Sequence, residues 1–195
     1  DRIISRNPCD NVSNIKSEET EREFLTFEEI KQLSLNLPEN VISQQVAKMF
    51  LFSCYTGLSI ANLLSLTFKQ IEGNKVGFFR EKTKTWHYVE LNKTALALVG
   101  DTANCQPSAK VFTTLNYHQC LYRLQKWGKK AGIPKKLKFH LGRHTFATLS
   151  LTQGVDLYTV QKLIGHKKLA TTQIYAKVID SVKRKAVDAL PQLEL

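Results

Sequence analysis

The chain has 195 residues, 43% hydrophobic and 23% charged, which is enough for one well-packed domain. Its 28 Lys and Arg residues against 17 Asp and Glu residues give a net charge of +11, which favours a polyanionic partner, most commonly nucleic acid. The sequence has no run of about 18 apolar residues, the length that a membrane-spanning helix needs. We also see no apolar segment near its start of the kind found in secretory signals. The four cysteines lack metal-site spacing, so we expect free thiols, no metal and a cytoplasmic protein.

The first third of the sequence predicts a polar segment followed by helices. Residues 1–23 are polar and typical of a linker or arm. Capping residues, a proline and a glycine then mark the helix boundaries. The expected helices are 26–35, with a capping box at Thr26–Glu29 and a break at Pro38; 43–55, ending at Gly57; and 59–66, capped by Ser59.

The remaining two thirds predict one hairpin and further helices. Residues 75–80 (KVGFFR) and 86–91 (WHYVEL) are aromatic and β-branched, and a polar segment joins them, as in a β-hairpin. Later segments are helical apart from an extended passage. They are a helix from 92 to 99, a short strand at Val111 and Phe112, a helix from 116 to the Gly-Ile pair at 132, and helices from His140 interrupted at Gly154 and Gly165. We therefore expect a mainly α domain with a small antiparallel β-sheet, of the α+β class.

One segment near the C-terminus concentrates side chains suited to phosphodiester chemistry. His140, Arg143 and His144 lie within five positions, His166 follows Gly165, and Tyr175 comes nine residues after His166. Arginine binds phosphate in a bidentate manner, histidine transfers protons, and a tyrosyl oxygen serves as a covalent nucleophile. Taken singly, each residue also fits an ordinary structural role, so spacing alone does not decide between the two.

Five sequence blocks together resemble the tyrosine recombinases, the phage-integrase family. They are REFLTFEEIKQL, YTGLSIANLLSLTF, REKTKTWHYVEL, HLGRHTFAT and LIGHKKLATTQIYAKV, and they occur in the family's order. The resemblance extends from about residue 6 to 180. It implies a tyrosine-recombinase catalytic domain at 24–180, preceded at 1–23 by the linker from an N-terminal core-binding domain. It also implies a tail at 181–195 that packs on a neighbouring protomer, although a helix folded onto its own domain fits that tail equally well.

The resemblance also implies a role for each matching residue. Tyr175 attacks the scissile phosphate, Arg143 clamps its oxygens, His140 helps to deprotonate the tyrosine, His166 donates to a phosphate oxygen, and Lys82 protonates the leaving 5′ oxygen. Lys84 is the second choice for the lysine, and a hairpin tip that only touches the DNA backbone is the alternative for both. His144 matches a position that is more often structural.

The chain departs from the family at Ser59, because the family has its first catalytic arginine after Thr-Gly-Leu. Losing a charged donor to the transition state costs about 2.7–4 kcal/mol. Three explanations stay open. Arg80 or Lys84, with Arg123 as a distant third, supplies the charge; the enzyme is slow; or the protein binds DNA without cutting it. A second departure, Gly142, is expected to affect packing and not chemistry.

These implications predict a bacterial, nucleoid-associated site-specific DNA recombinase or integrase that acts on double-stranded DNA through a 3′-phosphotyrosine, without a metal or other cofactor. The alternatives are a type IB topoisomerase-like enzyme and a DNA-binding accessory protein. Self-association on DNA as a dimer or tetramer is expected through the tail. Eight lysines are predicted to contact phosphates: Lys84, Lys129, Lys130, Lys135, Lys136, Lys138, Lys167 and Lys168.

Overall fold

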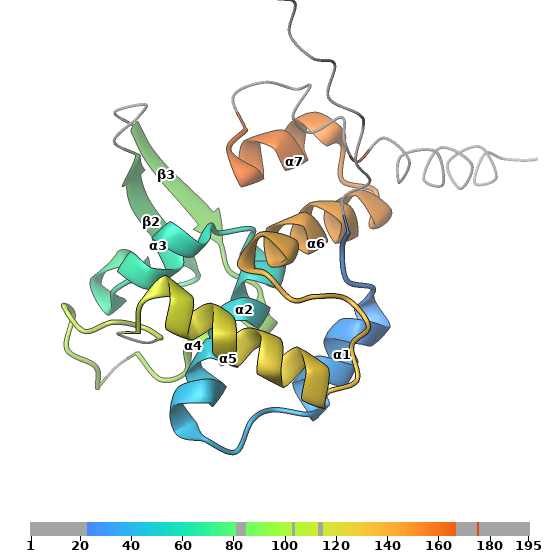
Figure 1. The fold of residues 1–195 in the computed structure, drawn as a ribbon. Helices are drawn as coiled ribbons and strands as arrows, with labels where there is room; N and C mark the ends of the chain where they lie inside the picture. The colour runs from blue at the N-terminus through green and yellow to red at the C-terminus, as the bar shows by residue number, and fades with distance from the viewer. Residues whose placement is uncertain (1–22, 81–84, 103, 113–114, 167–174, 176–195) are drawn as a thin grey trace, which may run out of the picture.

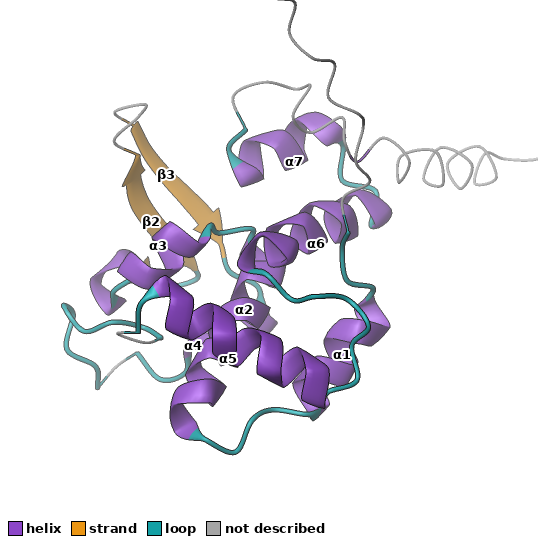
Figure 2. Cartoon of the chain, in the orientation of Figure 1, coloured by secondary structure: helices purple, strands orange, loops and turns teal. Residues whose placement is uncertain are grey.

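A computed structural model of the chain describes residues 23–80, 85–102, 104–112, 115–166 and 175 (Figure 1). The elements are α1 (Phe27–Leu35), α2 (Val41–Thr56), α3 (Ile60–Ser65), the 3-10 helix η1 (Phe68–Gln70), β1 (Ile71–Glu72), β2 (Lys75–Arg80), β3 (Thr85–Glu90), α4 (Lys93–Val99), α5 (Tyr117–Lys130), α6 (Phe139–Thr152) and α7 (Leu157–Ile164). They confirm a mainly α domain with one small antiparallel sheet (Figure 2).

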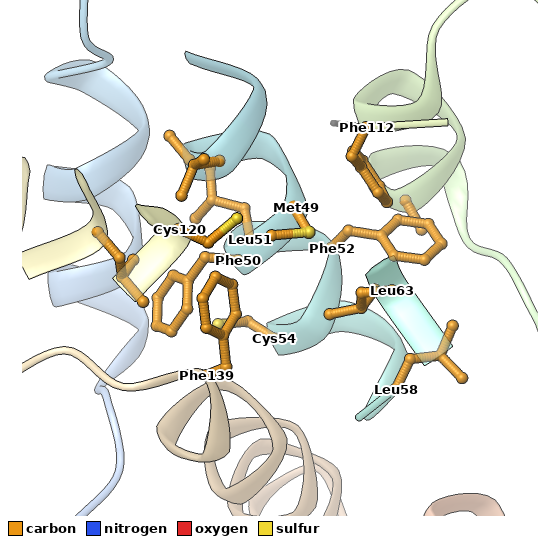
Figure 3. Packing of buried hydrophobic residues seen from close by; sticks show 14 of the residues in the cluster. Met49, Phe50, Leu51, Phe52, Cys54, Leu58, Leu63, Phe112, Cys120 and Phe139 are labelled. Carbon is orange, nitrogen blue, oxygen red and sulfur yellow. The ribbon is translucent and has the colours of Figure 1, made fainter. Parts of the chain in front are cut away.

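Helix α2 forms the centre of the domain, because most of its residues are buried and it contacts α4, α5 and α6. The ring of Phe50 packs edge-on against Trp127 of α5 and Phe139 of α6, with ring centroids 6.2 Å apart in both pairs. Phe52 packs against Phe112 at 5.2 Å (Figure 3). Such aromatic pairs contribute about 0.5–1.5 kcal/mol each beyond the area they bury, so α2 fixes the positions of its neighbours.

The predicted helix boundaries are confirmed by their caps. Thr26 and Glu29 form both hydrogen bonds of a capping box at the start of α1. Gly57 ends α2 in the left-handed conformation, with φ of +68°. Ser59 begins α3, and its Oγ accepts a hydrogen bond from the backbone N of Asn62 at 3.5 Å. Gly57 and Ser59 therefore turn the chain sharply between α2 and α3.

The predicted hairpin is confirmed as strands β2 and β3, paired antiparallel with Val76 opposite Val89. Strand β1 adds a third strand that the sequence analysis did not predict, since it is only two residues long and turns through Gly73. The strand expected at Val111 and Phe112 is wrong. In the described residues this segment forms an isolated bridge between Lys110 and Thr67, with the backbone N of Val111 donating to the Leu66 carbonyl at 3.1 Å.

Helix α6 packs closely on α2 at Gly142. A Cβ atom at this position would lie 3.1 Å from the side chain of Ser53, closer than most Cβ contacts, so a larger residue would require the two helices or the Ser53 side chain to shift. The expectation that Gly142 serves packing is therefore supported. Helix α7 packs on the opposite part of α6, through a small apolar cluster that includes Ala147, Val160 and Ile164. None of the helices in the described ranges has both the length and the apolar character needed to cross a bilayer.

Candidate active site

Arg143 lies in the second turn of α6 and joins the C-terminal ends of two other helices. Its Nη1 donates a hydrogen bond to the carbonyl oxygen of Gly57 at 2.7 Å, and its Nη2 donates to the carbonyl oxygen of Ile164. Gly57 is the residue that ends α2, and Ile164 is the last residue of α7. Because helix C-termini carry partial negative charge, these two carbonyls hold the guanidinium in a defined place.

Tyr175 lies beside α6 with its side chain almost fully buried. Its residue is 4% exposed, and its hydroxyl lies 2.5 Å from Nδ1 of His144, which is itself 6% exposed. The imidazole ring of His140 packs edge-on against that of His144, with ring centroids 4.2 Å apart. The structure therefore places the two histidines and the tyrosine in a continuous row, His140 to His144 to Tyr175.

This row has the composition of an activated nucleophile. A phenol has an ordinary pKa near 10, so it needs a base to react near neutral pH. An imidazole nitrogen within hydrogen-bond distance of the hydroxyl is the arrangement in which a histidine accepts that proton. Arg143 lies one residue before His144 on the same helix, so α6 carries both a cation and a candidate base.

The sequence analysis described His144 as matching a position that is more often structural, whereas the structure places it against the candidate nucleophile. The resemblance assigned deprotonation to His140, whereas the side chain that contacts the Tyr175 hydroxyl is His144. A signal was present in the sequence, because residues four apart on a helix share a face and His140 and His144 have that spacing. The exposed position of His140 leaves it at the outer end of the row.

His166 follows the glycine that ends α7. Gly165 has a φ of +66°, and the backbone of His166 is fixed by Gln161, which accepts from its N at 3.0 Å and donates to its O at 3.0 Å. The His166 residue is half-buried. The end of α7 therefore fixes the backbone of His166 two residues after Ile164, whose carbonyl oxygen accepts from Arg143.

Ser59, where the family has an arginine, lies two residues after Gly57, the other carbonyl partner of Arg143. Of the three cations considered as substitutes, Arg123 is placed elsewhere. Its Nη1 donates to Ser43 Oγ at 3.0 Å, near the opposite end of α2, and 14 residues of helix correspond to about 20 Å. The backbone of Arg80 ends β2. Lys82 and Lys84 lie outside the described residues, as do Lys167 and Lys168.

The other predicted DNA-contacting lysines differ in their surroundings. Lys129, Lys130, Lys136 and Lys138 are exposed, and Lys130 makes only a long ion pair of 3.7 Å with the exposed Glu39. Lys135 differs, because its Nζ lies 2.6 Å from Glu29 Oε2 and its side chain is 25% exposed. Its charge is therefore already neutralised within the domain. Among the described residues, no group of three His, Cys, Asp or Glu side chains is arranged to hold a metal ion.

Comparison with known proteins gives the same family at the level of sequence and fold. The model of the phage integrase family matches residues 23–181. The tyrosine recombinase XerC of Caldanaerobacter subterraneus subsp. tengcongensis is 30% identical over 97% of this chain and 57% of its own length. The chain thus spans little more than half of that relative.

Solved structures are similar as well. The crystal structure of XerA recombinase superposes with a TM-score of 0.70 at 25% identity, covering 89% of this chain and 67% of XerA. That of the XerH site-specific recombinase bound to its difH substrate has a TM-score of 0.69 at 19% identity, covering 92% of this chain and 57% of XerH. Because the family model matches most of the residues, from the first described helix through the candidate nucleophile, the chain belongs to the phage integrase family.

Proposed function

We propose that this chain is the catalytic part of a site-specific DNA recombinase that cuts and rejoins double-stranded DNA through a 3′-phosphotyrosine. One observation carries the proposal: the Tyr175 hydroxyl lies 2.5 Å from an imidazole nitrogen of His144, next in sequence to the helix-bridging Arg143. Membership of the phage integrase family and the net charge of +11 support a DNA substrate.

In the proposed reaction, the Tyr175 oxygen attacks the phosphorus while its proton passes to Nδ1 of His144. The bond between phosphorus and the 5′ oxygen breaks, and that oxygen takes a proton, which we assign to Lys82. The 3′-phosphotyrosine keeps the energy of the phosphodiester, so reversal with another 5′ hydroxyl rejoins a strand without a nucleotide or metal. Arg143, with His166 as a further donor, stabilises the charge that develops on the phosphate oxygens.

A guanidinium has five N–H donors, so Arg143 can bind the scissile phosphate beside its two helix-end carbonyls or in place of them. Its two helix-end carbonyls are neutral dipoles, whereas a phosphate oxygen is a full anion and forms roughly twice as strong a hydrogen bond. The scissile phosphate therefore competes effectively for the guanidinium. The two carbonyls serve as a support that keeps Arg143 in position before DNA arrives.

We propose Arg80 as the substitute for the arginine absent at Ser59. Its backbone lies at the end of β2, and the paired strand β3 contacts α7 through the hydrogen bond of His87 Nε2 with the Leu163 carbonyl, 3.4 Å long. Arg80→Ala is expected to abolish cleavage and leave DNA binding nearly intact. Cleavage at the parental rate in that variant would eliminate Arg80, and Lys84→Ala is the next variant to compare.

The proposal is tested by covalent capture. The chain is incubated with a pool of nicked duplexes of random sequence, and protein–DNA adducts that survive denaturation are isolated and sequenced. Tyr175→Phe should abolish the adducts, whereas Tyr158→Phe, a matched change at an exposed tyrosine of α7, should leave them unchanged. Adducts that persist in Tyr175→Phe would refute the assignment of the nucleophile, and no adduct at all would favour a DNA-binding accessory protein.

The captured sequences then separate the two enzymatic alternatives. A recombinase needs paired copies of one site to exchange strands, whereas a type IB topoisomerase-like enzyme relaxes a supercoiled plasmid without them. We further propose that the chain self-associates on DNA through 181–195, a segment outside the described residues. Truncation after residue 180 should abolish dimers or tetramers on DNA in sedimentation. We also propose that the protein acts in the bacterial cytoplasm, with the nucleoid, where its proposed DNA substrate lies.

A further inference from the structure

The outer face of the sheet carries three exposed aromatic side chains. Phe79 on β2 is 43% exposed, while Trp86 and Tyr88 on β3 are 75% and 64% exposed. Phe79 pairs with Trp86 across the two strands, with ring centroids 5.8 Å apart. Alternate residues of a strand point to the same side, so these three rings form one surface, the aromatic face. Neither catalysis nor the core uses it.

The aromatic face includes open space and a cation. Gly77 lies opposite Tyr88, and a Cβ at Gly77 would meet no atom within 4 Å, so the surface beside the Tyr88 ring is unobstructed. Lys75 Nζ lies 5.4 Å from the centre of that ring and 3.3 Å from Glu90 Oε1, so this cation is paired with a carboxylate. The chain as a whole carries a net charge of +11. A flat aromatic surface on a basic protein suits a ligand that has planar rings and negative charge.

The aromatic face lies on the reverse side of a strand that contacts the candidate active site. His87 stands between Trp86 and Tyr88 in sequence and points to the opposite side of the sheet. There its Nε2 lies 3.4 Å from the Leu163 carbonyl, and the next carbonyl of α7, that of Ile164, accepts from Arg143. The aromatic face and the helix that bonds to Arg143 therefore lie on opposite sides of β3.

We propose that the aromatic face binds unpaired bases of single-stranded DNA by stacking on Trp86 and Tyr88. Bases in a duplex hide their faces, so only an unpaired strand offers rings to this surface. The phosphates of the same strand suit the net positive charge of the chain. Such a strand would be one that has been cut and is leaving its duplex, and this part of the proposal rests on the proposed function. The binding itself does not, and it can be measured without any cleavage.

Tryptophan fluorescence reports this binding directly. The chain has two tryptophans. Trp127 is 4% exposed and donates its Nε1–H to the Asn36 carbonyl at 2.7 Å, so its emission serves as a constant background. Titration with a 12-nucleotide single strand should quench Trp86. An abasic strand of the same length keeps every phosphate and lacks the bases, so it separates stacking from charge.

Trp86→Ala and Tyr88→Ala test the surface by affinity. Stacking on one side chain changes affinity by roughly five- to 150-fold, so each variant should bind the single strand at least fivefold more weakly. Binding to duplex and to the abasic strand should change less than twofold. The matched control is Tyr158→Ala, which removes a 59% exposed tyrosine that also has a lysine near its ring, Lys162 Nζ at 4.4 Å.

Two results would overturn the proposal. One is equal affinity of the parental chain for the normal and abasic strands. The other is a sedimentation change in Trp86→Ala without any loss of single-strand affinity, which would assign the aromatic face to contact with a second copy. Adduct formation is recorded separately on Tyr175, so failure of stacking and failure of the proposed function give different results.

Discussion

Replacing Gly57 with alanine tests the geometry of the candidate active site most sharply. The residue has φ of +68°, where an alanine costs about 1–2 kcal/mol. Its new Cβ would lie 2.6 Å from Cδ1 of Phe146 and 3.2 Å from Cγ2 of Ile164, an overpacking that costs about 1–3 kcal/mol. The sum predicts that Gly57→Ala lowers the free energy of unfolding by about 2–5 kcal/mol, a large share of the usual 5–15 kcal/mol.

Two other glycines separate the two costs. Gly154 has φ of +88° with no atom within 4 Å of a Cβ, so Gly154→Ala should lose only the conformational part. Gly77 has open space and no positive φ, so Gly77→Ala should be neutral or slightly stabilising. In the Gly57→Ala background, Phe146→Leu should restore part of the overpacking cost.

Urea unfolding followed by circular dichroism measures all four variants, provided that the slope with denaturant stays constant. A Gly57→Ala penalty no larger than that of Gly154→Ala would refute the clash with Phe146. The same substitution should also slow adduct formation, because the Gly57 carbonyl is a partner of Arg143. Normal adduct formation in a destabilised Gly57→Ala variant would show that this carbonyl does not position the arginine.

Three further predictions follow from single contacts. His144→Ala should slow adduct formation by about 10²-fold with unchanged DNA affinity in a mobility-shift assay, and an unchanged rate would contradict its role as base. Hydrogen bonds from Thr159 lower the pKa of Asp156. The loss of stability in Asp156→Ala should therefore be constant above about pH 5 and vanish as the pH falls through the native pKa. A difference in urea midpoint between the parental chain and Asp156→Ala that is as large at pH 2 as at pH 7 would contradict this. Burial raises the pKa of the Cys54 thiol, so iodoacetamide at pH 8 should label the partly exposed Cys105 and spare Cys54 until the chain unfolds, as peptide mass spectrometry can determine.

Local signals account for the parts of the fold that the sequence predicted well. The capping box at Thr26 and the left-handed glycines at 57 and 165 act within a few residues, so they can be recognised from the local sequence alone. Strand β1 and the bridge at Lys110 depend on partners that lie elsewhere in the chain. A two-residue strand has almost no periodicity of its own, so tertiary pairing decides it.

The sequence named candidate residues for the site, but it did not predict which atoms these residues contact. The family resemblance named Arg143 and Tyr175 as candidates, yet it could not predict that Arg143 would bond to two helix ends 107 positions apart in the chain, at Gly57 and Ile164. The choice of His144 over His140 as the neighbour of Tyr175 depends on how α6 is rotated about its axis. That rotation depends on tertiary packing, such as the close approach of α6 to α2 at Gly142, which the sequence does not show.

The bridge made by Arg143 has a thermodynamic consequence for α7. One guanidinium supplies both the hydrogen bond to the last carbonyl of α7 and the donors that a DNA phosphate would take. If a phosphate takes the donor that now bonds to α7, phosphate binding weakens the docking of α7, and the docking of α7 weakens phosphate binding by the same free energy. Helix α7 also contacts the hairpin, through the hydrogen bond between the Leu163 carbonyl and His87. A phosphate that took the Arg143 donor from Ile164 would loosen the end of α7 and so weaken this contact with the sheet.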